Sequence, residues 1–145
     1  MSSAVRNVLA AVGGAAAAIA VVALSDLLVG RIVPLPSSVD LQTPERARAA
    51  IAAVPLPALV LLVSGWALAG GIGAFVAARL SAGRRMLVGL IVAALLVLAT
   101  VANLAMVPHP AWMWPAALVL IPLLGWLGAR AGSTLGRSMH RLAPR

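Results

Sequence analysis

Long runs of apolar residues dominate the pattern of hydrophobic and polar positions along the chain. A helix needs about 20 apolar residues to cross a bilayer core that is about 30 Å thick. Four runs reach that length, at about 7–29, 56–79, 86–107 and 111–130. An open strand would leave backbone groups unpaired in lipid, so each run is predicted to be a transmembrane helix.

One long polar segment, at about 30–55, separates the first apolar run from the second. Within it, Thr43 has the character of a helix N-cap, and Pro44 suits the first helical position. These residues predict a short helix at about 44–53. Arginines beside alanine and isoleucine favour a helix lying in the membrane interface. A solvated connector is an equally compatible interpretation.

Composition indicates that the solvent of this chain is lipid. The chain is 63% hydrophobic and 10% charged, with a mean hydropathy of +1.08, whereas a soluble domain carries about 25% charged residues. It contains no cysteine, which excludes disulfides and thiolate metal sites. The formal charge of +8 comes from arginine alone. Because arginines mark the cytoplasmic ends of membrane proteins, we expect no nucleic-acid partner.

The arginines are distributed unevenly between the two ends of the predicted spans. Eight fall at the termini and in the 79–86 loop, while three fall in the 30–55 segment beside two acids. The positive-inside rule therefore predicts that both termini lie in the cytoplasm. The richness in alanine and arginine without lysine is typical of bacterial coding, so we expect a bacterial inner-membrane protein. Segments 30–55 and 107–111 would face outward, and 131–145 would form a basic cytoplasmic tail. We expect the whole chain to form a single membrane domain.

Small residues recur every four positions along two of the spans. Gly65 and Gly73 lie on the second span, and Gly128 and Gly132 lie at the end of the fourth. In lipid, helices associate through close packing of such residues. The pattern predicts an all-α protein, a four-helix antiparallel bundle with a spare small-residue face. That face could form a homo-oligomer or contact other membrane subunits.

Polar side chains gather in the predicted outer half of the membrane. They are Asp26, Ser64, Thr100, Asn103 and His109. Polar groups are costly in lipid and tend to face the interior of a bundle. One interpretation is structural, with Asp26 and Asn103 hydrogen-bonded across the bundle. The alternative is an outward-facing polar pocket that binds a lipid, a quinone or another small ligand, or relays protons.

The stretch "NLAMVPHPAWMW" joins the third span to the fourth. Pro108 predicts the end of one helix, and Pro110 predicts the start of the next. His109 lies between them and would be fixed and exposed. Trp112 and Trp114 are typical of the aromatic belt at a membrane interface. The stretch is therefore predicted to be a rigid turn anchored by tryptophan.

Catalytic and cofactor signatures are weak. No acid, base and nucleophile converge in the sequence, and His109 and His140 fall on opposite membrane faces, so they cannot share a metal or haem. We expect no metal, no cofactor and no enzymatic activity. The leading hypothesis is a bundle that self-associates or serves as an accessory subunit of a membrane complex. The alternative is a small transporter or a ligand-binding membrane protein.

Several stretches together resemble an uncharacterised family of small bacterial four-helix membrane proteins. They are the Pro-rich loop with Asp40, "LVSGWALAGGIGAFVAAR", "NLAMVPHPAWMW" and "PLLGWLGARAG". The resemblance covers about 34–132 and implies a fold and a membrane location without an activity. Transporters of the small multidrug-resistance type are similar in size and span count. They carry a glutamate midway along the first helix, where this chain has Gly13 and Gly14.

Overall fold

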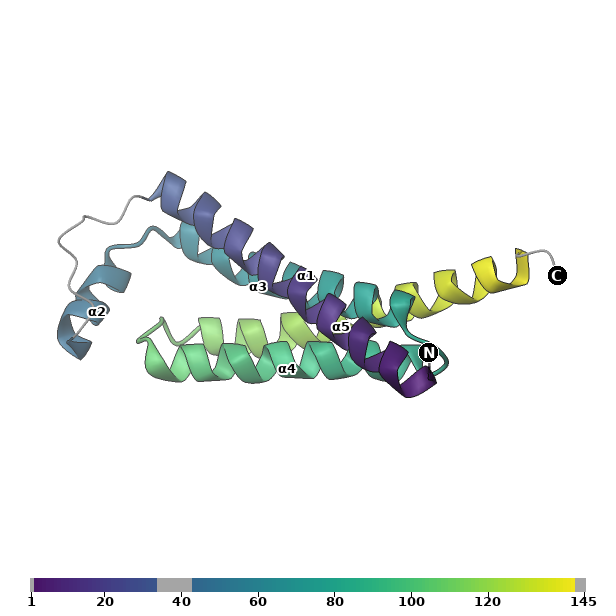
Figure 1. Ribbon diagram of the computed structural model, residues 1–145. Helices are drawn as coiled ribbons and strands as arrows, with labels where there is room; N and C mark the ends of the chain where they lie inside the picture. The colour runs from purple at the N-terminus through teal and green to yellow at the C-terminus, as the bar shows by residue number, and fades with distance from the viewer. Residues whose placement is uncertain (1, 34–42, 143–145) are drawn as a thin grey trace.

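The computed structural model describes residues 2–33 and 43–142, with side chains given except at positions 44, 46–48 and 136–142. These residues form only helices and connecting turns (Figure 1). The elements are α1 (Ser3–Ile32), α2 (Pro44–Ala52), α3 (Leu56–Leu80), α4 (Arg85–Met106) and α5 (Met113–Leu142). The prediction of an all-α bundle of four long helices with a short additional helix is confirmed. Asp40 lies outside the described residues.

The four long helices coincide with the four predicted spans and differ from them mainly at the ends. α1 starts before the apolar run because the side chain of Ser2 caps it, accepting a hydrogen bond from the backbone N–H of Val5 at 3.3 Å. α2 begins after Thr43, as predicted, although the Thr43 side chain makes no capping bond. α5 continues past the predicted end of the fourth span, and its apolar part covers Met113–Leu135.

Helix α3 lies at the centre of the bundle and packs against α1, α4 and α5. α1 contacts α3 and, less extensively, α4, and it makes no helix contact with α5 in the described ranges. Figure 1 shows the N-terminus of α1 and the α3–α4 turn at one end, which we call the basic end. The opposite end carries α2 and the α4–α5 turn, and we call it the α2 end.

Glycines bring the helix backbones into direct contact on both sides of α3. A Cβ atom added at Gly14 of α1 would lie 2.6 Å from the carbonyl oxygen of Gly73, and one added at Gly89 of α4 would lie 2.8 Å from that of Ala74. At Gly128 of α5, an added Cβ would fall on the carbonyl oxygen of Gly71. Any larger side chain at these positions would force the helices apart.

The small-residue positions singled out in the sequence therefore face other helices of the same chain. Gly65 and Gly73 lie against α1, at Ser25 and Ala18, while Gly128 and Gly132 of α5 lie against α3. The expected spare face is not formed by these glycines. Any contact with a second chain must use another surface.

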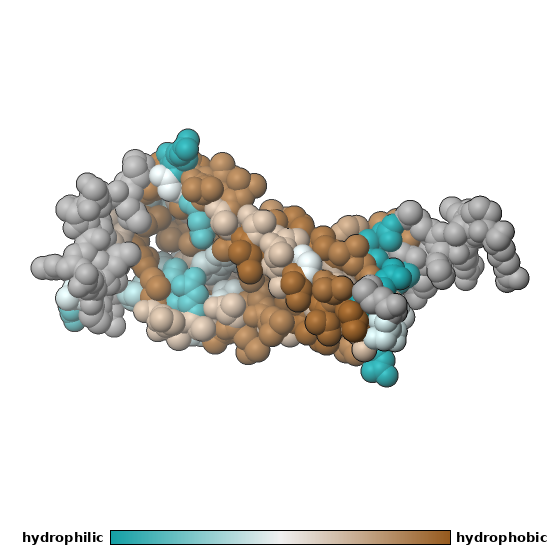
Figure 2. Space-filling view, in the orientation of Figure 1, coloured by the Kyte–Doolittle hydropathy of each residue, from teal (hydrophilic) through white to brown (hydrophobic). Residues whose placement is uncertain are grey.

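The outer surface of the long helices is apolar. Figure 2 shows hydrophobic residues over the middle of the molecule and hydrophilic residues towards its two ends. Within the described part of the chain, four helices are long and apolar enough to cross a membrane. Large exposed side chains such as Ile19, Leu68, Leu98 and Val119 place apolar groups on all four of them. This surface is suited to lipid contact.

We expect Gly128→Ala to destabilise the bundle by about 1–3 kcal/mol, because the added methyl group would overlap the Gly71 carbonyl and separate α3 from α5. Gly30→Ala is the matched control, since an added Cβ there meets no described atom within 4 Å. Thermal unfolding in detergent micelles compares the two variants. Equal unfolding midpoints would contradict packing of α3 and α5 through Gly128.

Candidate functional site

The α4–α5 turn is held by a carbonyl group that accepts two hydrogen bonds from one residue. Val107 follows α4, and its N–H donates to the Asn103 carbonyl at 2.9 Å. The Val107 carbonyl oxygen lies 2.8 Å from the backbone nitrogen of His109 and 2.9 Å from its ring atom Nδ1. Pro108 stands at the centre of this three-residue turn, where its fixed φ is suitable.

Helix α3 also contacts the ring of His109, through Trp66. The imidazole meets the indole of Trp66 edge to face, with ring centroids 5.8 Å apart and an interplanar angle of 72°. Such edge-to-face pairs stabilise aromatic contacts. Trp66 is buried, and His109 is half-buried. His109 is therefore less exposed than expected, because one edge of the turn packs onto Trp66.

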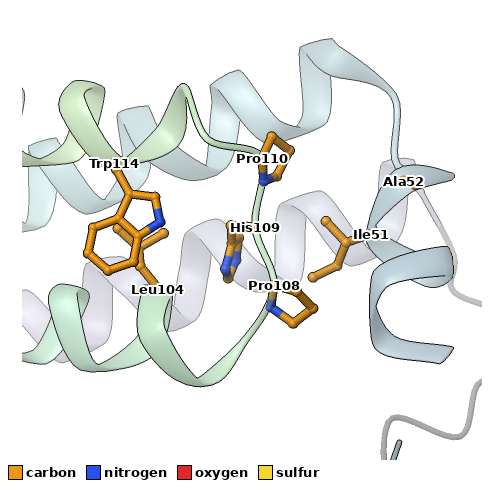
Figure 3. A pocket seen from close by; sticks show the side chains of 7 residues that line it. All are labelled: Ile51, Ala52, Leu104, Pro108, His109, Pro110 and Trp114. Atoms are coloured by element: carbon orange, nitrogen blue, oxygen red, sulfur yellow. The ribbon is translucent and has the colours of Figure 1, made fainter. Parts of the chain in front are cut away.

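A pocket of about 450 Å³ opens beside this ring at the α2 end. Figure 3 shows its lining, which comes from α2, the end of α4, the turn and the start of α5. The lining residues are Ile51, Ala52, Leu104, Pro108, His109, Pro110 and Trp114. Ligand pockets in proteins are typically ~300–1,000 Å³ and mainly apolar with a few placed polar groups. This pocket lies within that range of volume and has a mainly apolar set of lining residues, but it is an open hollow and not an enclosed cavity.

Two nitrogen atoms supply the polar side-chain groups of the pocket. Nε2 of His109 and Nε1 of Trp114 have no hydrogen-bond partner in the described part of the chain. Neither nitrogen is fully buried. Among the described residues, the one fully buried side-chain nitrogen or oxygen atom without a partner is Nη1 of Arg85. Neither nitrogen of the pocket is therefore sealed inside the bundle, and both belong to residues that line the pocket.

A tightly packed core supports the pocket from within the bundle. Met113, at the start of α5, is 0% exposed, and Ile121 is 1% exposed. Both belong to a cluster with Leu59, Val63, Trp66, Ala67, Leu104 and Ala117. Leu104 lines the pocket and belongs to this cluster, and Trp114 packs against it. The pocket wall is thus continuous with the core between α3, α4 and α5.

The other polar residues of the predicted outer cluster do not join His109. Asp26 is exposed and lines a separate hollow along α1 with Ala23, Leu27, Gly30 and Arg31. Ser64 is exposed, and its hydroxyl donates to the Val60 carbonyl at 2.7 Å. Asn103 is exposed, whereas Thr100 is buried. In residues 2–33 and 43–142, no hydrogen bond links two side chains of this predicted cluster.

The two tryptophans of the turn occupy different environments. Trp112 is 37% exposed and lies outside the pocket, while Trp114 is half-buried and lines it. Spacing alone makes them look equivalent, because both fall in the same short stretch. Helix α5 separates them, since it starts at Met113 and turns Trp114 towards the core.

Sequence reasoning missed a polar contact at the basic end. Oδ1 of Asn7 on α1 accepts hydrogen bonds from the Ser81 hydroxyl at 2.7 Å and from the Ala82 N–H at 2.9 Å. Ser81 is completely buried. Nearby, Nε of Arg6 donates to the Leu80 carbonyl at 3.2 Å. These bonds fasten the start of α1 to the α3–α4 turn. The signal available in the sequence was an amide side chain near the start of an otherwise apolar helix.

We expect Asn7→Ala to destabilise the protein by about 1–3 kcal/mol, because the buried Ser81 hydroxyl and the Ala82 N–H would lose their acceptor. Asn7→Asp keeps an oxygen acceptor and should retain most of the stability. Asn103→Ala is the control, because Asn103 is exposed. Thermal unfolding and hydrogen exchange at the Ala82 amide give the readouts. Unchanged exchange in Asn7→Ala would contradict this fastening.

The fold and the surface together define the class of the protein. It is a multi-pass membrane protein, a bundle of four long helices with four candidate spans. Comparison of the chain with protein-family models, with curated proteins and with solved structures finds no match. The four long apolar helices are those of a small four-span membrane protein, and no family is identified.

Proposed function

We propose that the protein is a non-enzymatic membrane protein that binds a small amphipathic molecule in the His109 pocket. The observation that carries this proposal is the pocket itself, with apolar walls and two accessible nitrogens at one end of a membrane-spanning bundle. A lipid, a quinone or another small ligand is compatible with its size. Proton relay through Asp26 and His109 has less support, because Asp26 lines a different hollow.

The distribution of charge supports an outward-facing pocket. Arg6, Arg84 and Arg85 lie at the basic end with no acid beside them among the described residues, whereas the three arginines of the α2 end, at positions 31, 46 and 48, are accompanied by Asp26 and Glu45. Under the positive-inside rule, the basic end faces the cytoplasm of a bacterial inner membrane. The pocket would then open in the outer interfacial layer, where amphipathic molecules concentrate. Helix α2 would lie in that layer as part of the pocket wall.

Filling the pocket should displace its occupant. We expect the wild-type protein, extracted gently and measured by native mass spectrometry, to carry a bound small molecule. Ala52→Trp should lose that molecule, because Ala52 lines the pocket and indole would occupy it. Ala49→Trp is the matched control on α2, since Ala49 is exposed and outside the lining. Equal ligand loads in the two variants, or none in the wild type, would refute pocket binding.

A second candidate function is that of a self-associating or accessory subunit of a membrane complex, and α1 favours it. In the most apolar 18-residue stretch of α1, only 17% of the residues are buried, whereas 50% are buried in the corresponding stretch of α3. Exposed apolar side chains follow the length of α1, including Val8, Val12, Ile19 and Leu27. Because the glycine faces are covered within the chain, this outer face of α1 is the surface on which a partner helix would pack.

A bulky side chain on α1 tests this second candidate. If a partner packs there, Ala16→Trp should reduce the assembled mass seen by native mass spectrometry at least severalfold, because indole would separate the two helices. Ala94→Trp is the control, at an exposed alanine midway along α4. A wild-type protein that is monomeric, or an assembly equally tolerant of both substitutions, would assign the α1 face to lipid.

A further inference from the structure

The two accessible nitrogens of the pocket have opposite hydrogen-bonding roles. A carbonyl oxygen can only accept, so the 2.9 Å contact between the Val107 oxygen and His109 requires a proton on Nδ1. In the neutral imidazole, Nε2 then carries no proton and is an acceptor. The indole Nε1–H of Trp114 can only donate. The pocket therefore offers one acceptor and one donor within apolar walls.

We propose that the pocket selects an apolar molecule that carries a hydroxyl group, of the phenol or long-chain alcohol class. Its hydroxyl would donate to Nε2 of His109, and its oxygen would accept from Nε1–H of Trp114. Figure 3 shows the two side chains on adjoining sides of the pocket, with the Trp114 nitrogen on the ring edge towards His109. This inference rests on the proposed ligand-binding function and names the ligand class of that site.

Groups that only accept, or only donate, satisfy one of the two nitrogens and leave the other unpaired. A ketone, quinone or ether oxygen can accept from Nε1–H of Trp114. It has no proton to donate to Nε2 of His109, so that nitrogen stays unpaired. An ammonium group donates to Nε2 but cannot accept from the indole N–H. An unpaired polar group in an apolar site carries the full cost of its desolvation. A hydroxyl is the smallest group that is both donor and acceptor.

The test compares 4-heptylphenol with its methyl ether, 4-heptylanisole, at equal mole fractions in nanodiscs that contain the full chain. The ether keeps the oxygen acceptor and removes the proton. Histidine labelled with ¹⁵N reports the ring protonation, and His109→Asn identifies the resonance among the two histidines of the chain. We expect a protonated Nδ1, a shift of the Nε2 resonance with the phenol, and about tenfold tighter binding of the phenol than of the ether.

Variants separate the role of each nitrogen. His109→Asn keeps a donor near the Val107 carbonyl and removes Nε2, so it should abolish the preference for the phenol over the ether. Trp114→Phe removes the donor, so it should weaken both probes about tenfold. Trp112→Phe is the matched control, because Trp112 lies in the same stretch but outside the pocket lining. It should change neither affinity.

The outcomes distinguish this inference from the proposed function. Equal binding of phenol and ether would overturn the selection of a hydroxyl while leaving ligand binding in place. A proton on Nε2 in place of Nδ1 would overturn it as well. If neither probe binds, the inference is wrong, and the ligand loads of Ala52→Trp and Ala49→Trp decide separately whether the pocket binds any molecule.

Discussion

The rest of the structure depends on the direct backbone contact between α3 and its neighbours. Lipid tails are as apolar as leucine, so burial of apolar area gives little driving force for helix association in a membrane. Close packing must replace it, and Gly73 against Gly14 and Gly128 against Gly71 provide that packing. Because α3 takes part in both contacts, it becomes the central helix around which α1, α4 and α5 are placed.

The central position of α3 determines what happens at each end of the bundle. Towards the α2 end, Trp66 of α3 is buried beside the α4–α5 turn, and its indole packs against the imidazole of His109. At the basic end, the turn after α3 presents Ser81 to Asn7 of α1. Helix α1, which touches only α3 and α4 among the described helices, is thereby held at a polar contact as well as along its small residues.

The spans were predictable because length and hydropathy alone determine them in lipid. The rotation of each helix was not predictable in the same way. A helix that is apolar on every side gives no periodic signal for its buried face. The sequence therefore did not show that the side chains of Asp26 and Asn103 are exposed on the surface of the bundle. The contact of Trp66 with His109 and that of Asn7 with Ser81 join residues far apart in sequence, and no local pattern specifies such pairs.

The chemistry of the pocket follows from the backbone of the turn more than from any charged group. Pro108 sets the geometry in which the Val107 carbonyl meets Nδ1 of His109. In the proposed site, that carbonyl accepts from Nδ1–H, which leaves Nε2 as the acceptor for a ligand. Helix α2 completes the wall with Ile51 and Ala52. The proposed site would thus gain its direction from one histidine tautomer beside one indole N–H, in a membrane protein with few polar groups.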